Sequence, residues 1–211
     1  MKKRRKLKKK VVVLIVLILI LLFVLTAGIV IYTRKHNNTS VPAETQVVDK
    51  IESYGYVLEN NKMDLYKDLF DKLVKVLKEE QVDEEEYAKI ISQMAVSDFY
   101  NLDNKTSKND IGGVQFIREK NRDNFILQAS ETVYKYIEQN LDGKRKQELP
   151  IVTKVDATSI KKGKYVYKNI KDDNAYTVIV KLEYKKDLGY PKQVVVKLLH
   201  TDKKLEIYYM K

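Results

Sequence analysis

The pattern of apolar and polar residues divides the chain into one long apolar run near its start and a mixed region after it. Residues 11–32 carry no charged side chain, eight lysines and arginines lie between Lys2 and Lys10, and Arg34 and Lys35 follow the run. A helix over these 22 residues is about 33 Å long, enough to cross the roughly 30 Å hydrocarbon core of a bilayer. We therefore expect Val11 to Tyr32 to form a transmembrane helix that contacts the lipid bilayer.

The basic residues predict the orientation of this helix. Cationic flanks stay on the cytoplasmic side, so the tail from Lys2 to Lys10 places the N-terminus inside and the C-terminal region outside the cell. A cleavable signal peptide is the alternative, but its apolar core is usually about 7–15 residues long and ends at a small-residue cleavage site. Gly28 to Tyr32 offers no good site, so we expect an uncleaved anchor in the cell membrane. Lys2 to Lys10 would also attract anionic lipid headgroups.

Helical periodicity appears after a polar linker, which covers residues 33–45. Apolar residues recur every three or four positions over Asp64 to Glu80, after Asp83, and over Asp123 to Asn140, which predicts three amphipathic helices. Asp83, followed three residues later by Glu86, is typical of the residues that cap the start of a helix. These helices belong to a folded region over residues 46–211.

Strand patterns flank and follow the helices. Gln46 to Leu58 is rich in β-forming residues around Gly55 and predicts one strand, and Val114 to Ile117 predicts a short second one. Apolar and polar residues alternate from Tyr176 to Tyr184, and again with Leu205, Ile207 and Tyr209 facing inward.

Turn signals separate these last strands at hairpin distances, at 171–174, 187–191 and 201–204. Such short links force antiparallel neighbours. Helices gathered on one face of a curved antiparallel sheet make an α+β domain, which is the fold class that we predict.

The corner after the second helix carries a resemblance. Val96 to Tyr100 ends that helix with the aromatic pair Phe99-Tyr100, and a loop and a strand are expected next. With the element order of residues 46–211, this resembles the NTF2-like superfamily of cone-shaped α+β folds. Within it, chains with a cytoplasmic tail, one membrane helix and an exported cone look like the VirB8-type subunits of conjugation and secretion machines. The strand expected before the first helix departs from that pattern.

Composition excludes several classes of partner and site. The formal net charge is +11 at pH 7, but residues 1–35 hold ten of the 40 basic residues, and the remainder has 30 basic against 29 acidic residues. That balance lacks the basic face that neutralises phosphates, so we expect no nucleic-acid partner. The chain has no cysteine, which excludes disulfides and thiolate metal sites. No cofactor, metal site or catalytic residue is expected, and the bias towards Lys, Tyr and Ile is typical of an AT-rich bacterial genome.

A few residues are candidates for chemistry or binding. Asp98, Tyr100 and His200 are the polar groups expected nearest a pocket between helices and sheet, although Asp98 also suits a helix end and His200 a strand end. His200 has no cysteine or second histidine near it in the sequence, and a lone imidazole makes a poor metal site.

Two further groups stand out by composition. Asp110 with Gly112 and Gly113 suggests either a backbone cradle for an anion or a turn that needs positive φ. Tyr190 and Tyr208, among 15 tyrosines, are candidate interface residues because tyrosine joins contact area to a hydroxyl.

Three functions follow as hypotheses, of which the third is a wall-associated or stress-response accessory whose basic tail binds anionic lipid. The first is a non-enzymatic single-pass membrane protein whose outer domain assembles with envelope proteins or with itself, with conjugation or secretion scaffolding implied by the resemblance. The second is a cone that binds a small ligand or acts as an enzyme. A cavity with converging polar groups would favour the second, and an interior filled by apolar side chains the first.

Overall fold

The computed structural model describes residue 26, residues 45–168 and residues 170–211. The expected basic tail (1–10), transmembrane helix (11–32) and linker (33–45) therefore lie outside the described residues, apart from Thr26 and Thr45. Among the described residues, no helix has the length and apolarity needed to cross a membrane.

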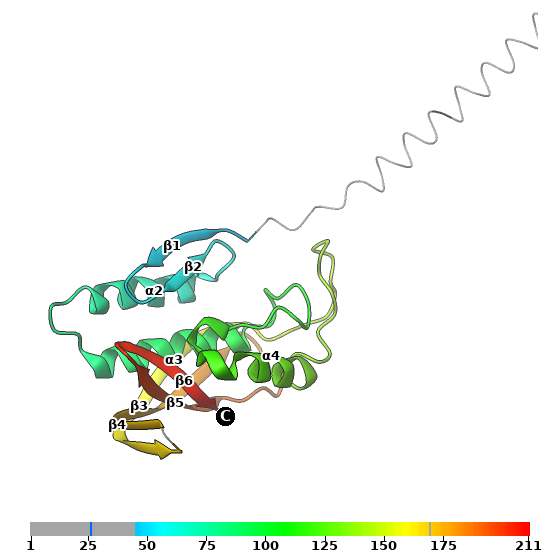
Figure 1. Cartoon of the computed structure of the whole chain (residues 1–211). Helices are drawn as coiled ribbons and strands as arrows, with labels where there is room; N and C mark the ends of the chain where they lie inside the picture. The colour runs from blue at the N-terminus through cyan, green and yellow to red at the C-terminus, as the bar shows by residue number, and fades with distance from the viewer. Residues whose placement is uncertain (1–25, 27–44, 169) are drawn as a thin grey trace, which may run out of the picture. The chain divides into compact units, whose positions relative to one another are not determined.

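The described domain is an α+β fold, as the sequence predicts, with helices covering one face of an antiparallel sheet (Figure 1). The sheet is a meander of four strands, each paired with the next along the chain. The turns predicted at 187–191 and 201–204 make two of its connections. In chain order, the elements are β1 (Val47–Ile51), β2 (Tyr56–Glu59), α2 (Asp64–Leu77), α3 (Glu84–Tyr100), η1 (Val114–Phe116), η2 (Glu119–Asn121), α4 (Arg122–Glu131), β3 (Val152–Tyr167), β4 (Ile170–Tyr184), β5 (Gln193–Thr201) and β6 (Lys204–Met210).

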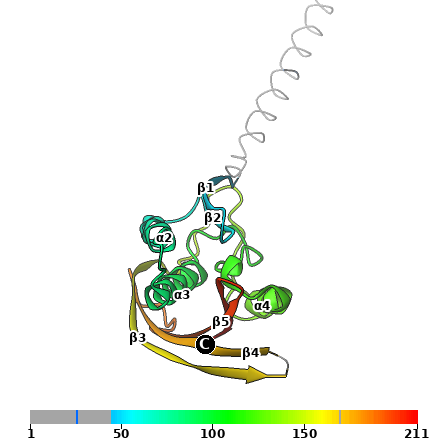
Figure 2. The same cartoon turned by 60° about the vertical axis from the view of Figure 1, so that its left-hand side comes forward.

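Helix α3 is the central element and lies between α2 and the sheet (Figure 2). Its start is capped by Asp83, whose carboxylate accepts hydrogen bonds from the backbone N–H groups of Glu85 and Glu86. These bonds satisfy donors that a helix start otherwise leaves without partners. From Ile90 to Tyr100 nearly every side chain is buried. The apolar stripe predicted for this helix is therefore part of a helix enclosed on several sides.

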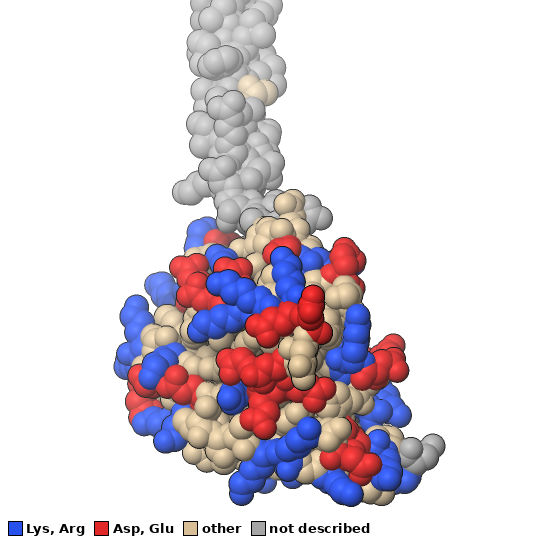
Figure 3. Space-filling model, turned by 90° about the vertical axis from the view of Figure 1, so that its left-hand side faces the viewer, with Lys and Arg blue, Asp and Glu red and all other residues tan. Residues whose placement is uncertain are grey.

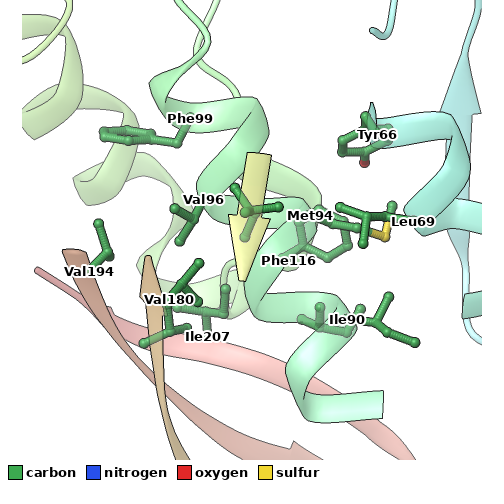
Figure 4. Packing of buried hydrophobic residues seen from close by; sticks show 14 of the residues in the cluster. Tyr66, Leu69, Ile90, Met94, Val96, Phe99, Phe116, Val180, Val194 and Ile207 are labelled. Carbon is green, nitrogen blue, oxygen red and sulfur yellow. The ribbon is translucent and has the colours of Figure 1, made fainter. Parts of the chain in front are cut away.

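The core fills the space between α3 and the sheet (Figure 4). Val96 of α3, Val180 of β4 and Val194 of β5 are fully buried. Every second residue of β4 from Tyr176 to Leu182 is buried, as its period-two pattern predicts. Leu69 of α2 adds to the same cluster, which is how α2 is held on the outer side of α3.

The stretch Gln46 to Leu58, expected to be one strand, is a β-hairpin. Strands β1 and β2 pair antiparallel, with Ile51 opposite Tyr56. Gly55 lies in the turn with φ +70°, a conformation that glycine adopts without steric cost. The glycine reverses the chain rather than bending a single strand, so the prediction of one strand was wrong.

The strand expected at Val114 to Ile117 was also wrong, because residues 114–116 form the 3-10 turn η1. Gly113 precedes it with φ +75°, which turns the chain away from the extended conformation. Ile117 alone makes a parallel bridge with Ile207 of β6. Between the left-handed Gly113 and the bridge at Ile117 the chain forms a 3-10 turn, so no strand forms here.

Helix α4 ends at Glu131, well before the expected end at Asn140. The next residue, Thr132, has φ −125° and ψ −94°, which is not helical. The cause is tertiary, because Tyr134 is fully buried and its hydroxyl donates to the Phe99 carbonyl at 2.6 Å. Tyr136, which lies within the range expected for this helix, is 77% exposed.

Two local predictions for the sheet were wrong. The turn expected at 171–174 lies inside β4, where the pairing with β3 shifts between Gly163 and Tyr165. In β6, an irregularity in the pairing next to Lys197 leaves Tyr209 41% exposed instead of inward. An extra residue in one strand changes which face the following side chains occupy, and hydrophobic spacing alone does not reveal it.

Candidate functional site

Asp98 lies near the C-terminal end of α3 and is 5% exposed. Lys105 Nζ lies 2.7 Å from its Oδ1, and Lys62 Nζ lies 3.0 Å from its Oδ2. The backbone N–H of Gly113 donates to Oδ2 at 2.8 Å. A buried charge is tolerated when it is both paired and hydrogen bonded, and these three donors satisfy both conditions.

The glycine pair expected as an anion cradle lies directly against this carboxylate. A Cβ on Gly112 would overlap the backbone carbonyl oxygen of Asp98, so only glycine fits there. The Gly112 N–H donates to the Tyr134 hydroxyl at 3.1 Å. In an anion cradle the Gly113 N–H would bind the anion. Here it already donates to the Asp98 carboxylate. We call Asp98, Lys62, Lys105, Gly112 and Gly113 the Asp98 corner.

Asp110, the third residue of the expected cradle, stabilises the preceding turn. Its Oδ2 accepts hydrogen bonds from the N–H and the hydroxyl of Thr106, at 2.9 and 3.2 Å. Together with Lys62 and Asp98 it lines a cavity of about 150 Å³. Such a volume has room for a few water molecules.

The electrostatics of the corner keep Asp98 ionised. Burial alone would raise the pKa of its carboxyl, but Lys105, Lys62 and the Gly113 amide outweigh burial and lower the pKa to about 2. Burial likewise opposes the charge of Lys62, while Asp98 and Glu59 raise its pKa. An acid with so low a pKa holds no proton to donate near neutral pH, so Asp98 is poorly suited to general acid catalysis there.

The stability of the domain is expected to fall in acid because of Asp98. The folded pKa is about 2, whereas an unfolded aspartate titrates near ~3.9. The stabilisation is therefore complete above about pH 4 and is lost as the pH falls towards about 2, and it amounts to about 2–3 kcal/mol. Urea-induced unfolding of the full chain in mild detergent, followed by tyrosine fluorescence at stepwise lower pH, measures it. An unfolding free energy that stays level over this interval would contradict the account.

The structure does not bring His200 and Tyr100 to Asp98. His200 lies beside the start of α3, with Nδ1 3.0 Å from Asp172 Oδ2 and Nε2 3.4 Å from Glu84 Oε1. Glu84 and Asp98 are 14 positions apart in α3, which the helical rise converts to about 21 Å. Tyr100 is buried in the core, and burial raises the pKa of its hydroxyl. The three residues expected around one pocket thus occupy separate places.

The two candidate interface tyrosines also lie apart. Tyr190 is partly buried beside Tyr184, with 6.5 Å between ring centroids. Tyr208 is partly buried against Tyr165 of β3, with ring centroids 4.6 Å apart. Tyr208 also lines a cleft of about 420 Å³ between α4 and β6, which we call the α4–β6 cleft. The cleft is lined by Ile117, Asn121, Asn124, Phe125, Gln128, Ile207, Tyr208, Tyr209, Met210 and Lys211.

A buried hydroxyl pair, Tyr56 with Tyr87, was not identified from the sequence. Their Oη atoms lie 2.6 Å apart. Tyr56 Oη donates to the Leu205 carbonyl, and the Leu205 N–H donates to Tyr87 Oη, each at 3.1 Å. The proton of the Tyr87 hydroxyl is therefore left for Tyr56, and the three groups close a cycle. This cycle connects β2, α3 and β6, and no local pattern marks such distant partners.

Removing one hydroxyl from this cycle is expected to destabilise the domain. The substitution Tyr56→Phe leaves the Tyr87 hydroxyl without its acceptor and the Leu205 carbonyl without a donor. Buried groups that lose their partners cost about 1–3 kcal/mol. Urea unfolding of the full chain in mild detergent measures the loss, with Tyr136→Phe as the matched control because that ring is 77% exposed. Equal stability of the two variants would contradict the role given to the cycle.

The two lysines of the Asp98 corner were also missed. Lysine is rarely fully buried, and neither Lys62 nor Lys105 stands out by its neighbours in the sequence. The position of Asp98 within an apolar helix segment was the one available signal, because a buried carboxylate requires a cation or several donors.

Within the described part of the chain, no group of three or more histidine, aspartate and glutamate side chains is placed to hold a metal ion. The geometry of the described residues presents a neutralised buried charge, a buried tyrosine pair and several surface clefts, among them the α4–β6 cleft. No family model matches the chain, and neither a curated protein nor a solved structure matches it.

Proposed function

We propose that this chain is a single-pass protein of a bacterial cell membrane that presents residues 46–211 outside the cell for protein–protein assembly in the envelope. Its N-terminus lies in the cytoplasm, Val11 to Tyr32 crosses the bilayer, and Lys2 to Lys10 contacts anionic lipid headgroups. Scaffolding of a conjugation or secretion machine is the specific form of this role. No residue of the domain performs catalysis in this proposal.

The charge pattern of the first 35 residues supports the membrane location. A stretch of 22 residues without charge is flanked by eight basic residues before it and two after it. Such a stretch is long enough to span a bilayer, and the basic excess orients the N-terminus towards the cytoplasm.

The order of the elements supports an NTF2-like cone. Helices α2, α3 and α4 precede the four-stranded meander, and α3 lies along the inner face of the curved sheet (Figure 2). The hairpin of β1 and β2 departs from that plan. Tyr56, which is fully buried, holds this hairpin on the core.

The filled interior is the observation that carries the assembly role. A ligand-binding cone requires a cavity with converging polar groups. The space between α3 and the sheet instead holds apolar side chains such as Val96 and Val180 (Figure 4). The charge of Asp98 is neutralised within the fold by Lys62 and Lys105. What remains for function is the outer surface.

A second function, binding of a small ligand, is favoured by the α4–β6 cleft. Its volume of about 420 Å³ falls in the range of small-molecule sites. Asn124, Gln128 and Tyr208 supply hydrogen-bonding groups, and Phe125 supplies an apolar wall. A thermal-shift screen of the full chain tests this function, with Gln128→Leu as the control. A compound that stabilises the parent chain but not the variant would support it.

The membrane topology can be tested by cysteine labelling, because the chain has no natural cysteine. Glu79→Cys lies in an exposed loop after α2, and Lys6→Cys lies in the basic tail. A membrane-impermeant maleimide applied to intact cells is expected to label the first variant and not the second. Labelling of both after lysis is the control. The reverse pattern in intact cells would refute the orientation.

The assembly role is tested by crosslinking in intact cells, extraction of the full chain in mild detergent, and identification of crosslinked proteins. A reproducible set of envelope proteins is expected, and Tyr190→Ala with Tyr208→Ala is expected to lose it. Tyr190→Phe with Tyr208→Phe keeps the ring packing against Tyr184 and Tyr165 and separates loss of contact from loss of stability. Recovery of an isolated chain, without envelope partners or self-association, would refute the assembly role.

A further inference from the structure

The closed end of the β3–β4 hairpin combines exposed apolar side chains with lysines. Val166 is 68% exposed and Tyr167 is 55% exposed. Around them are five exposed lysines, and the neighbouring acidic residues are Asp172 and Asp173. We call this set the hairpin tip. It consists of Lys161, Lys162, Lys164, Val166, Tyr167, Lys168 and Lys171.

The base of the hairpin is held by the body of the domain. The Tyr165 ring lies against Tyr208 of β6 at 4.6 Å, and Asp172 accepts hydrogen bonds from the His200 N–H at 2.8 Å and pairs with His200 Nδ1 at 3.0 Å. The ladder between β4 and β5 covers Tyr176 to Lys181, so the part of β4 nearer the tip pairs with β3. Figure 2 places this end of the hairpin at the margin of the domain. These contacts with β5 and β6 fix the base of the hairpin to the rest of the domain.

The charge at the tip is positive. Five lysines face two aspartates between residues 161 and 173, and Asp173 pairs weakly with Lys164 and Lys171, at 3.6 and 3.5 Å. Exposed pairs of this kind contribute little, so the lysines stay available to a partner. Figure 3 shows Lys and Arg side chains, with Asp and Glu side chains among them, along the lower margin of the domain.

We propose that the hairpin tip docks on the surface of a bilayer that contains anionic lipid. Tyrosine favours the membrane–water interface, an aliphatic side chain enters the boundary of the acyl chains, and lysines bind anionic headgroups while their stems lie along apolar surface. A soluble polyanion would use the lysines but leave Val166 and Tyr167 in water. The combination of both features at one end of the sheet is what selects the bilayer.

This inference rests on the proposed function, because the membrane anchor is what would hold the domain beside a bilayer. Docking then gives the domain a second attachment and restricts its rotation about the linker. Such a restriction would present the same face of the domain to partners in every copy.

A single tryptophan tests the proposal, because the chain has none of its own. The full chain with Tyr167→Trp is reconstituted into phosphatidylcholine vesicles with and without phosphatidylglycerol, and in matching vesicles with brominated acyl chains. With phosphatidylglycerol present, we expect a blue shift of the emission and quenching by the brominated lipid. Each neutralised lysine is expected to weaken docking about fivefold. A chain that also carries Lys161→Gln, Lys162→Gln, Lys164→Gln and Lys168→Gln should therefore lose both signals.

Tyr136→Trp is the matched control, because Tyr136 is also exposed and lies outside the hairpin tip. Its emission should respond to neither lipid. Unquenched, solvent-like emission of the Tyr167→Trp chain in brominated anionic vesicles would overturn the proposal. So would a response to free polyphosphate without quenching by brominated lipid, which would identify a soluble polyanion. The labelling of Glu79→Cys and Lys6→Cys does not involve the tip, so failed docking and failed topology are distinguishable.

Discussion

Replacing Asp98 with asparagine is expected to lower the free energy of unfolding by about 3–5 kcal/mol, because removing one partner of a buried ion pair leaves the other charge uncompensated. Lys105 is 3% exposed and cannot reach water without moving, and the Lys62 side chain is 12% exposed. The amide of asparagine retains an acceptor for the Gly113 N–H. The loss of unfolding free energy therefore measures the effect of leaving the two lysine ammonium groups without their carboxylate. This is the largest effect that we expect from a single polar substitution in the chain.

Urea-induced unfolding of the full chain in mild detergent, followed by tyrosine fluorescence, measures this loss at neutral pH. Asp68→Asn is the control, because Asp68 is exposed on α2 and should change stability by less than about 0.5 kcal/mol. The difference between the parent and Asp98→Asn should shrink as the pH falls towards about 2, where the parent's own carboxylate takes up a proton. Partial recovery when Lys105→Met is added to Asp98→Asn would identify the unpaired lysine as the source. A loss no larger than that of Asp68→Asn would contradict the role of the corner.

The substitution Gly112→Ala is expected to destabilise the domain by about 3 kcal/mol or more. Its Cβ would overlap the backbone carbonyl of Asp98, and backbone atoms of a buried helix cannot move aside as a flexible side chain can. Overpacking of a buried site typically costs about 1–3 kcal/mol, and more where relief is blocked. The displaced loop would also carry Gly113 away from the Asp98 carboxylate, to which it donates at 2.8 Å.

Gly163→Ala is the matched control for this prediction. A Cβ at Gly163 meets no atom within 4 Å, so the added methyl group has space. Its reduction of chain entropy in the unfolded state should leave stability unchanged or slightly higher. Unfolding of both variants by urea under the same conditions gives the comparison. Equal stability of the two alanine variants would show that the close approach at Gly112 relaxes at little cost.

Much of the fold was predictable from spacing alone. The alternation from Tyr176 to Leu182 predicted a half-buried strand, and the 3–4 spacing that includes Leu69 and Leu73 predicted an amphipathic helix, and the structure has both. These predictions succeed because each depends only on which residues share a face of one element. Short turns then fix antiparallel neighbours without any knowledge of distant residues.

Two of the misassigned elements, α4 and the segment after Gly113, share a different cause. Helix α4 stops early because Tyr134 bonds Phe99 across the domain, and the residues after Gly113 curl because the glycine is held against Asp98. In each case a contact between residues distant in the chain overrides the local propensity. No window of neighbouring residues contains that information.

The candidate site likewise combines residues that the sequence indicated with contacts that only the structure shows. Asp98 and the pair Gly112-Gly113 were selected separately from the sequence, one as a polar residue near a helix end and the other as an unusual glycine cluster. Only the folded chain shows that the amide of Gly113 binds the carboxylate of Asp98, and that Lys62 and Lys105 complete its partners.

The sequence by itself determined the α+β class, the antiparallel order of the final strands, the near balance of charge after residue 35 and the long uncharged apolar run near the start. The tertiary structure decided that His200 lies far from Asp98, that Tyr56 and Tyr87 share a buried hydrogen bond, and which apolar side chains remain exposed. The physical reason is the separation along the chain between the residues that determine each feature. Periodicity and charge are properties of neighbouring residues, whereas burial, ion pairing and exposure depend on residues brought together by folding.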